Sequence, residues 1–278
     1  MLTRLRALAP WSAVGSLVLL AFTSAELGTA EAHATPADEP VERAPSVAEQ
    51  GWLTRSVAAT PRAPVADACP SGMVLVEGNY CPEVQQRCLR WLDSEKGRFA
   101  HYRCAEYAPS KCLSAEKKPM RFCIDRDEHV SAGQSLPDNH VSLTGAARAC
   151  SNEGKRVCRE SEWNFACEGE EMRPYPYGFS RDASACNADL TEIVDGDGKL
   201  KDLRAPPGAH PRCASPFGVR DLAGNMEEMV ARDGPGLETA MKGAYWQPSK
   251  NHCRAAQTTH DAWYSGTETG FRCCGDAE

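Results

Sequence analysis

The stretch SPFGVRDLAGNMEEM, residues 215–229, carries the most specific pattern in the chain. It combines a Pro-Phe-Gly turn, a short apolar segment, a Gly-Asn turn and two adjacent carboxylates, Glu227 and Glu228. Turn residues on both sides of a short apolar segment are typical of a chain that changes direction often. Adjacent side chains point away from each other, so the two carboxylates are not predicted to work together as a general acid and base.

Two short helices are predicted upstream of this stretch. Residues 143–154, LTGAARACSNEG, contain Thr144 and follow Ser142; either residue can cap a helix, and a glycine ends the segment. Residues 160–169, ESEWNFACEG, begin with two glutamates in the turn where the helix dipole favours acids, and again end in a glycine. A short strand, KRVC, is expected between the two helices.

The remaining segments predict short strands and loops. Residues 73–81, MVLVEGNYC, alternate apolar and polar residues before a Gly-Asn turn signal, as a strand entering a hairpin does. Residues 121–129, RFCIDRDEH, predict another short strand. Residues 82–119 hold three cysteines among mixed charges without clear periodicity, which indicates a loop-rich insertion stapled by disulfides. Two helices within such a framework favour an α+β fold class.

The first 68 residues differ from the rest of the chain in composition. Residues 1–25 place two arginines before an apolar run that ends in small residues, which predicts a secretory signal peptide cleaved after Ala25. The run is too short to span a bilayer, so no transmembrane anchor is expected after cleavage. Residues 26–68 are rich in Ala, Pro, Glu, Thr and Ser and predict a disordered linker. The expected location is secreted or periplasmic.

All 14 cysteines lie between Cys69 and Cys274, in the part predicted to be exported. An even number of cysteines in an oxidising compartment predicts up to seven disulfides. A zinc site is disfavoured because the chain has no Cys-x-x-Cys pair and no closely spaced pair of histidines. The formal net charge is −7 with no visible basic patch, which argues against a nucleic-acid partner.

Several short blocks occur in one order along residues 69–275: SLTGAARAC, GKRVCRESEWNFACEG, YPYG, CNAD, SPFGVRDLAGNMEEM, KGAYW, CRAAQ and GFRCC. Together they resemble the formylglycine-generating enzyme, or sulfatase-modifying factor, family. The resemblance implies that family's variant of the C-type lectin fold, here loop-rich and disulfide-stapled, with residues 69–275 as one domain. The chain is a divergent member, because Glu227 and Met229 stand where the family pattern has tryptophans.

The family's enzymes oxidise a cysteine of a sulfatase to formylglycine and bind copper through two cysteines. The resemblance places these positions at Gln247 and close to His252, beside Cys253. Cuprous copper is a soft ion that favours thiolate ligands, so copper is not expected here. The alternative is a formylglycine-generating type of oxidoreductase with a rearranged metal site built from His252, Cys253 and His260.

Family disulfides map onto this chain by the same resemblance. It implies that Cys150 bonds to Cys273 and that Cys167 bonds to Cys253. For one further pair we expect Cys158 and Cys186. The adjacent Cys273 and Cys274 are expected to have separate partners, since a disulfide between neighbouring residues is strained.

The resemblance also implies structural calcium. The oxygen ligands of one site map to the side chains or carbonyls of Asp221, Gly224, Met226 and Glu228, and hard oxygen ligands suit Ca²⁺. A weaker second site maps to Asn187, Asp195 and Asp197. Solvated polar turns are the alternative interpretation of both segments.

Four aromatic residues map close to the family's substrate groove, and these are Tyr245, Trp246, Trp263 and Tyr264. They form a candidate groove for a peptide, protein or glycan ligand, with a role in the core as the alternative. The sequence thus predicts an exported domain that binds a ligand or acts as a scaffold at the cell envelope without catalysis. Rearranged oxidoreductase chemistry and a purely structural surface module remain the competing hypotheses.

Overall fold

The computed structural model describes residues 68–236 and 238–278. The predicted signal peptide, and all but the last residue of the predicted linker, lie outside this part. No helix in the described residues is long and apolar enough to span a membrane. The elements in chain order are β1 (Met73–Tyr80), β2 (Val84–Gln85), β3 (Cys88–Trp91), β4 (Cys104–Tyr107), β5 (Lys111–Cys112), β6 (Lys118–Asp125), α1 (Leu143–Asn152), β7 (Arg156–Val157), α2 (Glu160–Glu168), β8 (Glu227–Ala231), β9 (Thr239–Lys242), β10 (Thr269–Gly270) and β11 (Cys273–Asp276).

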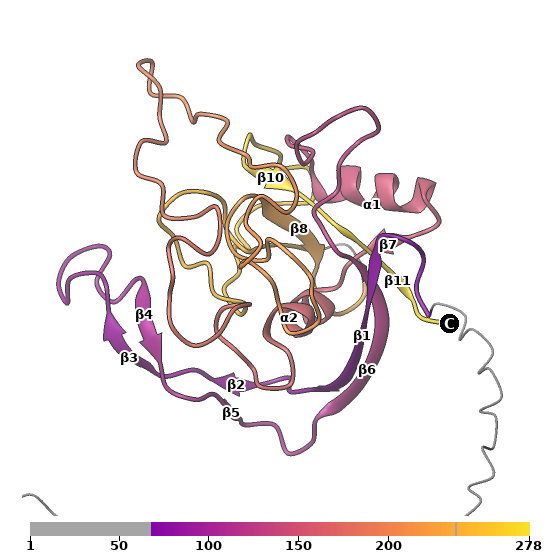
Figure 1. Cartoon of the computed structure of the whole chain (residues 1–278), viewed down its shortest axis with the longest axis horizontal. Helices are drawn as coiled ribbons and strands as arrows, with labels where there is room; N and C mark the ends of the chain where they lie inside the picture. Colours follow the sequence, from indigo (N-terminus) through magenta and orange to yellow (C-terminus); the bar gives the residue numbers. More distant parts are fainter. Residues whose placement is uncertain (1–67, 237) are drawn as a thin grey trace, which may run out of the picture. The chain divides into compact units, whose positions relative to one another are not determined.

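The larger sheet has the strand order β1-β6-β11-β7 and joins the two ends of the domain (Figure 1). β1 and β6 are antiparallel, with Met73 opposite Asp125 and Tyr80 opposite Lys118. The C-terminal strand β11 is antiparallel to both β6 and β7. Both long strands overlap the predicted ones. In β1, Val76 is buried between more exposed neighbours, whereas in β6 the whole run from Phe122 to Asp125 is buried.

The smaller sheet has the order β10-β8-β9 and lies at the centre of the domain. β8 is antiparallel to β9 and parallel to β10. β8 is formed by the end of the 215–229 stretch, and every residue of β8 except Glu227 is buried. The preceding Gly-Asn turn requires its glycine, since Gly224 has φ of +89° and an added Cβ would lie 2.4 Å from the Asn187 carbonyl oxygen.

Residues 82–119 form two short antiparallel strand pairs, one enclosing the other, that continue from the β1–β6 ribbon (Figure 1). β2 pairs with β5, and β3 pairs with β4. The disulfides Cys81–Cys112 and Cys88–Cys104 hold this segment. The sequence did not predict these strands because they are only two to four residues long, and all except β4 are largely exposed, so they show no regular apolar pattern.

Both helices form at the predicted places. α1 begins after Ser142, whose hydroxyl accepts a hydrogen bond from the Gly145 backbone N–H at 3.1 Å. α2 is capped differently, because the Glu162 carboxylate accepts the Arg159 backbone N–H at 2.8 Å. α2 is buried on nearly all sides, and its Trp163 is fully buried in the main core cluster.

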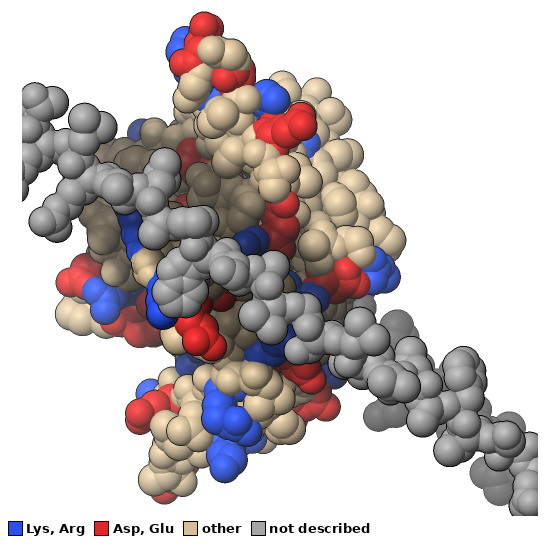
Figure 2. Space-filling model, turned by 90° about the vertical axis from the view of Figure 1, so that its left-hand side faces the viewer, with Lys and Arg blue, Asp and Glu red and all other residues tan. Residues whose placement is uncertain are grey.

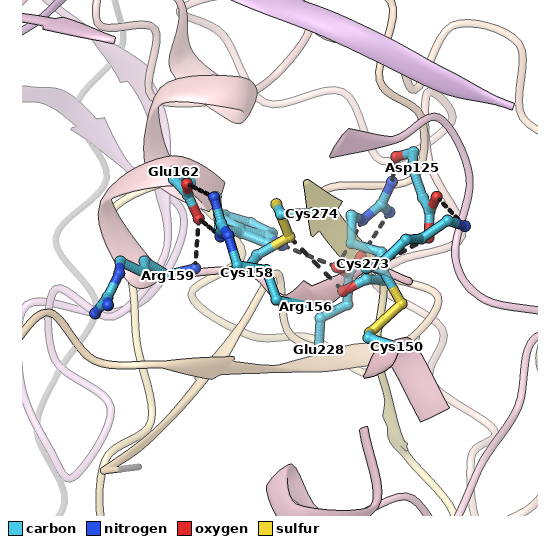
Figure 3. Close-up of a disulfide and its surroundings, with 12 residues drawn as sticks. Asp125, Cys150, Arg156, Cys158, Arg159, Glu162, Glu228, Cys273 and Cys274 are labelled. Atoms are coloured by element: carbon cyan, nitrogen blue, oxygen red, sulfur yellow. Dashed lines mark hydrogen bonds and ion pairs between the residues drawn. A yellow bond between two sulfur atoms is a disulfide. The ribbon is translucent and has the colours of Figure 1, made fainter. Parts of the chain in front are cut away.

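Every cysteine of the chain is disulfide-bonded. The structure contains the two pairs implied by the family resemblance, Cys150–Cys273 and Cys167–Cys253. Cys273 and Cys274 have separate partners, as expected (Figure 3). The bonds link the C-terminal strand to α1 and to the segment between β7 and α2.

The prediction that Cys158 bonds to Cys186 is wrong. Cys158 bonds to Cys274, and Cys186 bonds to Cys213. β7 is antiparallel to β11, with Val157 opposite Cys273 and Arg156 opposite Cys274, so the end of β7 lies beside the C-terminal strand and Cys158 is within reach of Cys274. Cys186 lies instead in a separate small apolar cluster that also contains Cys213.

Candidate functional site

Glu228 lies in the centre of the core and forms an ion pair with Arg272. Both side chains are at most 1% exposed. The Arg272 guanidinium donates to the two Glu228 carboxylate oxygens at 2.7 and 2.6 Å, and the Trp163 indole N–H donates to one of them at 2.9 Å. The same guanidinium donates to the backbone carbonyl oxygens of Asp125, Arg126 and Arg220, so the ion pair links β8 to the end of β6 and to the start of the 215–229 stretch. The geometry of Glu228 is that of a structural residue.

The predicted calcium set of Asp221, Gly224, Met226 and Glu228 stays a prediction, and this arrangement weakens it. Arg272 hydrogen-bonds both Glu228 oxygens and neutralises their charge, so a Ca²⁺ ion would have to share Glu228 with the guanidinium. Burial raises the pKa of Asp221 to about 6, partly offset by Arg272, and one Asp221 oxygen has no hydrogen-bond partner. Among residues 68–236 and 238–278, no three Asp, Glu, His or Cys side chains are grouped to hold a metal ion.

The residues of the weaker second calcium site also have other partners. The Asn187 amide donates to the Leu203 carbonyl oxygen at 2.8 Å and to the Asn225 side-chain oxygen at 2.9 Å. One Asp195 carboxylate oxygen accepts the backbone N–H groups of Asp197 and Lys199. The two aspartates are exposed and form a polar turn, which was the alternative interpretation.

Glu128, which the sequence did not single out, holds the Gly-Asn turn of the 215–229 stretch through hydrogen bonds. Glu128 is 3% exposed, and its carboxylate accepts hydrogen bonds from the Asn225 side chain and from the Met226 backbone N–H. Burial holds the pKa of Glu128 well above its usual range, with Glu228 and Asp221 adding to the effect. The only signal was an acid near the end of the strand predicted over residues 121–129, and an acid in that place is usually solvated.

A pocket of about 500 Å³ lies beside the smaller sheet. Its walls come from β8, the segment after β9 and the loop before β10. The residues that line it are Tyr102, Glu227, Met241, Gly243, Ala244, Tyr245, Gln247, Ser249, Lys250, His252, Ala255, Ala256, Gln257, His260, Tyr264 and Glu268. The pocket therefore combines carboxylates, tyrosines and neutral polar groups.

Two of the four aromatic residues proposed for a groove line this pocket, namely Tyr245 and Tyr264. The other two do not. Trp246 is fully buried in the core, because the chain alternates between the pocket and the interior after the turn at Gly243. Trp263 is 76% exposed and lies outside the pocket lining.

The histidines of the alternative metal site both line the pocket, but Cys253 does not join them. Cys253 is bonded to Cys167, so its assignment as a metal ligand is wrong. Burial lowers the pKa of His252 to about 4, and its Nδ1 atom has no hydrogen-bond partner. The His260 ring stacks on Tyr264 with the ring centroids 3.6 Å apart. The disulfide keeps Cys253 in the core and His252 at the pocket wall.

Gln247 lines the same pocket as His252. These are the two positions to which the family resemblance assigns the copper cysteines, and neither residue supplies a thiolate. Outside the pocket, acidic and basic side chains are interspersed over the visible part of one face (Figure 2).

Comparisons with known proteins agree with this architecture. The family model of the sulfatase-modifying factor enzyme 1-like domain matches residues 89–277. Inactive C-alpha-formylglycine-generating enzyme 2 of Bos taurus is 31% identical over 160 residues, covering 51% of this chain and 51% of that protein. Formylglycine-generating enzyme of Bos taurus is 26% identical over 167 residues, covering 50% of this chain and 44% of that protein. The chain thus spans about half the length of the curated relatives it matches.

Two solved structures share the fold. The CarF structure has a TM-score of 0.51 at 13% identity, covering 75% of this chain and 99% of that chain. PvdO from Pseudomonas aeruginosa has a TM-score of 0.51 at 16% identity, covering 78% of this chain and 100% of that chain. The fold is the loop-rich, disulfide-stapled α+β fold of formylglycine-generating enzymes. Since the family model covers more than half of the sequence, the chain belongs to the sulfatase-modifying factor enzyme 1-like domain family.

Proposed function

We propose that this chain is an exported, non-catalytic member of its family that binds a ligand in the pocket between β8 and the loop before β10. One observation carries the proposal: all 14 cysteines are bonded in disulfides, which leaves no thiolate at the pocket. Gln247 and His252 line the pocket, and the family resemblance sets the two copper cysteines at Gln247 and close to His252. An amide and a neutral imidazole do not form the linear thiolate pair that holds cuprous copper.

Two further observations support the proposal. The relatives include proteins named inactive C-alpha-formylglycine-generating enzyme 2, from Bos taurus and Mus musculus, at 31% identity. Disulfides in this number form and persist in oxidising compartments, which favours the secreted or periplasmic location predicted from the N-terminal sequence. A role at the cell envelope, with the folded domain held on a linker, is consistent with both.

An activity assay tests the proposal directly. The oxidised full chain is supplied with copper and oxygen and incubated with a Cys-x-Pro-x-Arg peptide, and the peptide is then analysed by mass spectrometry. We expect no conversion of cysteine to formylglycine, while a formylglycine-generating enzyme assayed in parallel converts the peptide. Conversion by this chain above the copper-only blank would overturn the proposal.

The competing hypothesis, an oxidoreductase with a rearranged metal site, needs a free thiolate or another ligand in place of Cys253. A thiol count on the unreduced protein in denaturant separates the two hypotheses. We expect no free thiol, because the structure pairs every cysteine. Two reactive thiols in the native preparation would favour the oxidoreductase instead.

A further inference from the structure

Two carboxylates meet at one wall of the pocket. Glu227 is the first residue of β8, and Glu268 immediately precedes β10. These strands are parallel neighbours with Thr269 opposite Glu227, and the Glu227 backbone N–H donates to the Glu268 carbonyl oxygen at 2.9 Å. The two acids are therefore fixed side by side by the backbone, although 41 positions separate their numbers in the sequence. Both side chains line the pocket.

This arrangement costs energy in the absence of a positive charge. Like charges on neighbouring strands destabilise a sheet, and burial increases the cost. Burial, together with the Glu268 carboxylate, raises the pKa of Glu227 to about 7, and no hydrogen bond contributes to that value. Glu268 accepts one hydrogen bond, from the Tyr264 hydroxyl at 2.7 Å. No Lys or Arg side chain forms an ion pair with either acid in the described part of the chain.

Two basic residues of the lining, Lys250 and His252, form no ion pair with Glu227 or Glu268. Lys250 is exposed and lies over the Tyr102 ring, 5.1 Å from its centroid. His252 is kept neutral by burial, which lowers its pKa to about 4. The adjacent residue Glu228 shows the contrast, since its carboxylate faces the core and binds Arg272. Glu227 faces the pocket without such a partner.

Aromatic rings complete the wall around the two acids. Tyr245 and Tyr264 line the pocket with Glu227 and Glu268, and both carboxylates raise the pKa of Tyr245 further above its usual value, which burial alone already raises. Tyr102 lies farther along the lining. The faces of aromatic rings attract cations, and carboxylates supply the opposite charge. A pocket with both is suited to a positively charged organic group.

We propose that the pocket binds an organic cation, an ammonium or guanidinium group, with Glu227 and Glu268 as its counter-ions and the tyrosine rings as its walls. This inference rests on the binding function proposed above. Binding places one positive charge between two carboxylates, which removes their mutual repulsion and gives Glu227 an ion-pair partner. Neutral ligands of the same shape lack this gain.

Calorimetric titration of the full chain tests the inference at about pH 8, where Glu227 is ionised. The probes are N-acetyl-lysine amide and N-acetyl-arginine amide, each matched by a neutral analogue of similar shape, the norleucine and citrulline amides. We expect at least one charged probe to bind about tenfold or more tightly than its neutral match. Comparison of the two charged probes distinguishes an ammonium from a guanidinium preference.

Variants locate the effect. Glu227→Gln and Glu268→Gln keep the shape of each side chain and remove one charge, and each should reduce the preference for the charged probe about tenfold. Glu116→Gln removes the same charge from an exposed position outside the pocket lining and should leave the preference unchanged. An equal loss in all three variants would reduce the effect to general electrostatics and overturn the inference.

Failure of this inference and failure of the proposed function give different results. If charged and neutral probes bind equally, or if none binds, the cation proposal is wrong, whatever the peptide assay shows. If the peptide assay detects formylglycine, the non-catalytic function is wrong, and the charge preference of the pocket is measured independently of it. Circular dichroism of each variant confirms that the domain remains folded.

Discussion

Glu227 and Glu228 are adjacent in the sequence and lie in opposite environments. Glu228 points into the core, where Arg272 and Trp163 satisfy its carboxylate. Glu227 points to the pocket beside a second carboxylate and has no cation. The difference follows from the alternation of side chains along β8. It teaches that a buried acid with its own arginine holds the fold, whereas a partly buried acid beside a like charge marks a place for a ligand.

The largest effect is expected from removing the cation on the core side. Arg272→Met leaves Glu228 buried without its counter-ion and should lower the free energy of unfolding by about 3–5 kcal/mol. Urea unfolding with the disulfides intact measures this loss. The double variant with Glu228→Gln should recover part of it, because the remaining amide carries no charge. A double variant as unstable as Arg272→Met alone would show that the charge of Glu228 is not the cause.

Removal of the Cys158–Cys274 disulfide, one of two that hold the C-terminal strand, should have the next largest effect on stability. Cys158→Ala with Cys274→Ala opens a link between residues 116 positions apart, and we expect a loss of about 2–4 kcal/mol in the free energy of unfolding. Cys88→Ala with Cys104→Ala opens a link of only 16 positions within one hairpin. Calorimetric unfolding of both double variants should show the smaller loss for the hairpin pair. The reverse order would mean that the hairpin contributes more to the fold than the short loop closed by its disulfide indicates.

Much of the fold was predictable from the sequence, because turn and cap residues act locally. Both helices form where Ser142 and the acids of the first turn of α2 predicted them. The pairing of Cys158 was not predictable, since it depends on the register between β7 and β11, two strands far apart in the sequence. Short exposed strands such as β3 likewise leave no apolar pattern to detect.

The pocket was only partly predictable, because its lining also depends on contacts between segments far apart in the sequence. Tyr245 and Tyr264 were expected near a groove, but a one-residue step along an extended chain puts Trp246 in the core instead. Glu268 was missed because its importance comes from a parallel strand pair that joins it to Glu227. The best available signal was its place just before the Gly-Phe-Arg-Cys block that supplies Arg272.

A third prediction concerns Glu227 in the pocket and the dependence of stability on pH. Burial and the neighbouring Glu268 raise the pKa of Glu227 to about 7, so the folded chain holds a proton more tightly than the unfolded chain does. The associated stability is complete below the ordinary carboxyl pKa and is lost as the pH rises through about 7. Glu227→Gln lacks this loss and should gain roughly 1–2 kcal/mol over the unmodified chain between about pH 5 and about pH 8.

Urea unfolding of both proteins across this pH range measures the difference. The other titratable or charged groups that line the pocket are Tyr102, Tyr245, Lys250, His252, His260, Tyr264 and Glu268. All of them are retained in the variant, so besides Glu227 itself only the groups that interact with its charge, Glu268, Tyr245 and Tyr264, contribute to the difference. A difference in stability that stays constant with pH would mean that Glu227 does not titrate in this window. If Glu227→Gln is more stable than the unmodified chain and has also lost the preference for cationic probes, the same carboxylate both lowers stability and binds the cation.

The smallest effect on stability is expected from added calcium. This measurement tests whether Arg272 is the counter-ion of Glu228. Since Arg272 already neutralises the charge of Glu228, we expect millimolar Ca²⁺ to leave the melting temperature of the chelator-treated protein unchanged. Magnesium at the same concentration controls for ionic strength. A rise in melting temperature with Ca²⁺ alone would restore the calcium assignment that the sequence predicted. Repeating the titration on Asp221→Asn would then show whether the ion binds at the 215–229 stretch, because loss of that carboxylate should remove the rise, whereas binding at the exposed turn of Asp195 and Asp197 should persist.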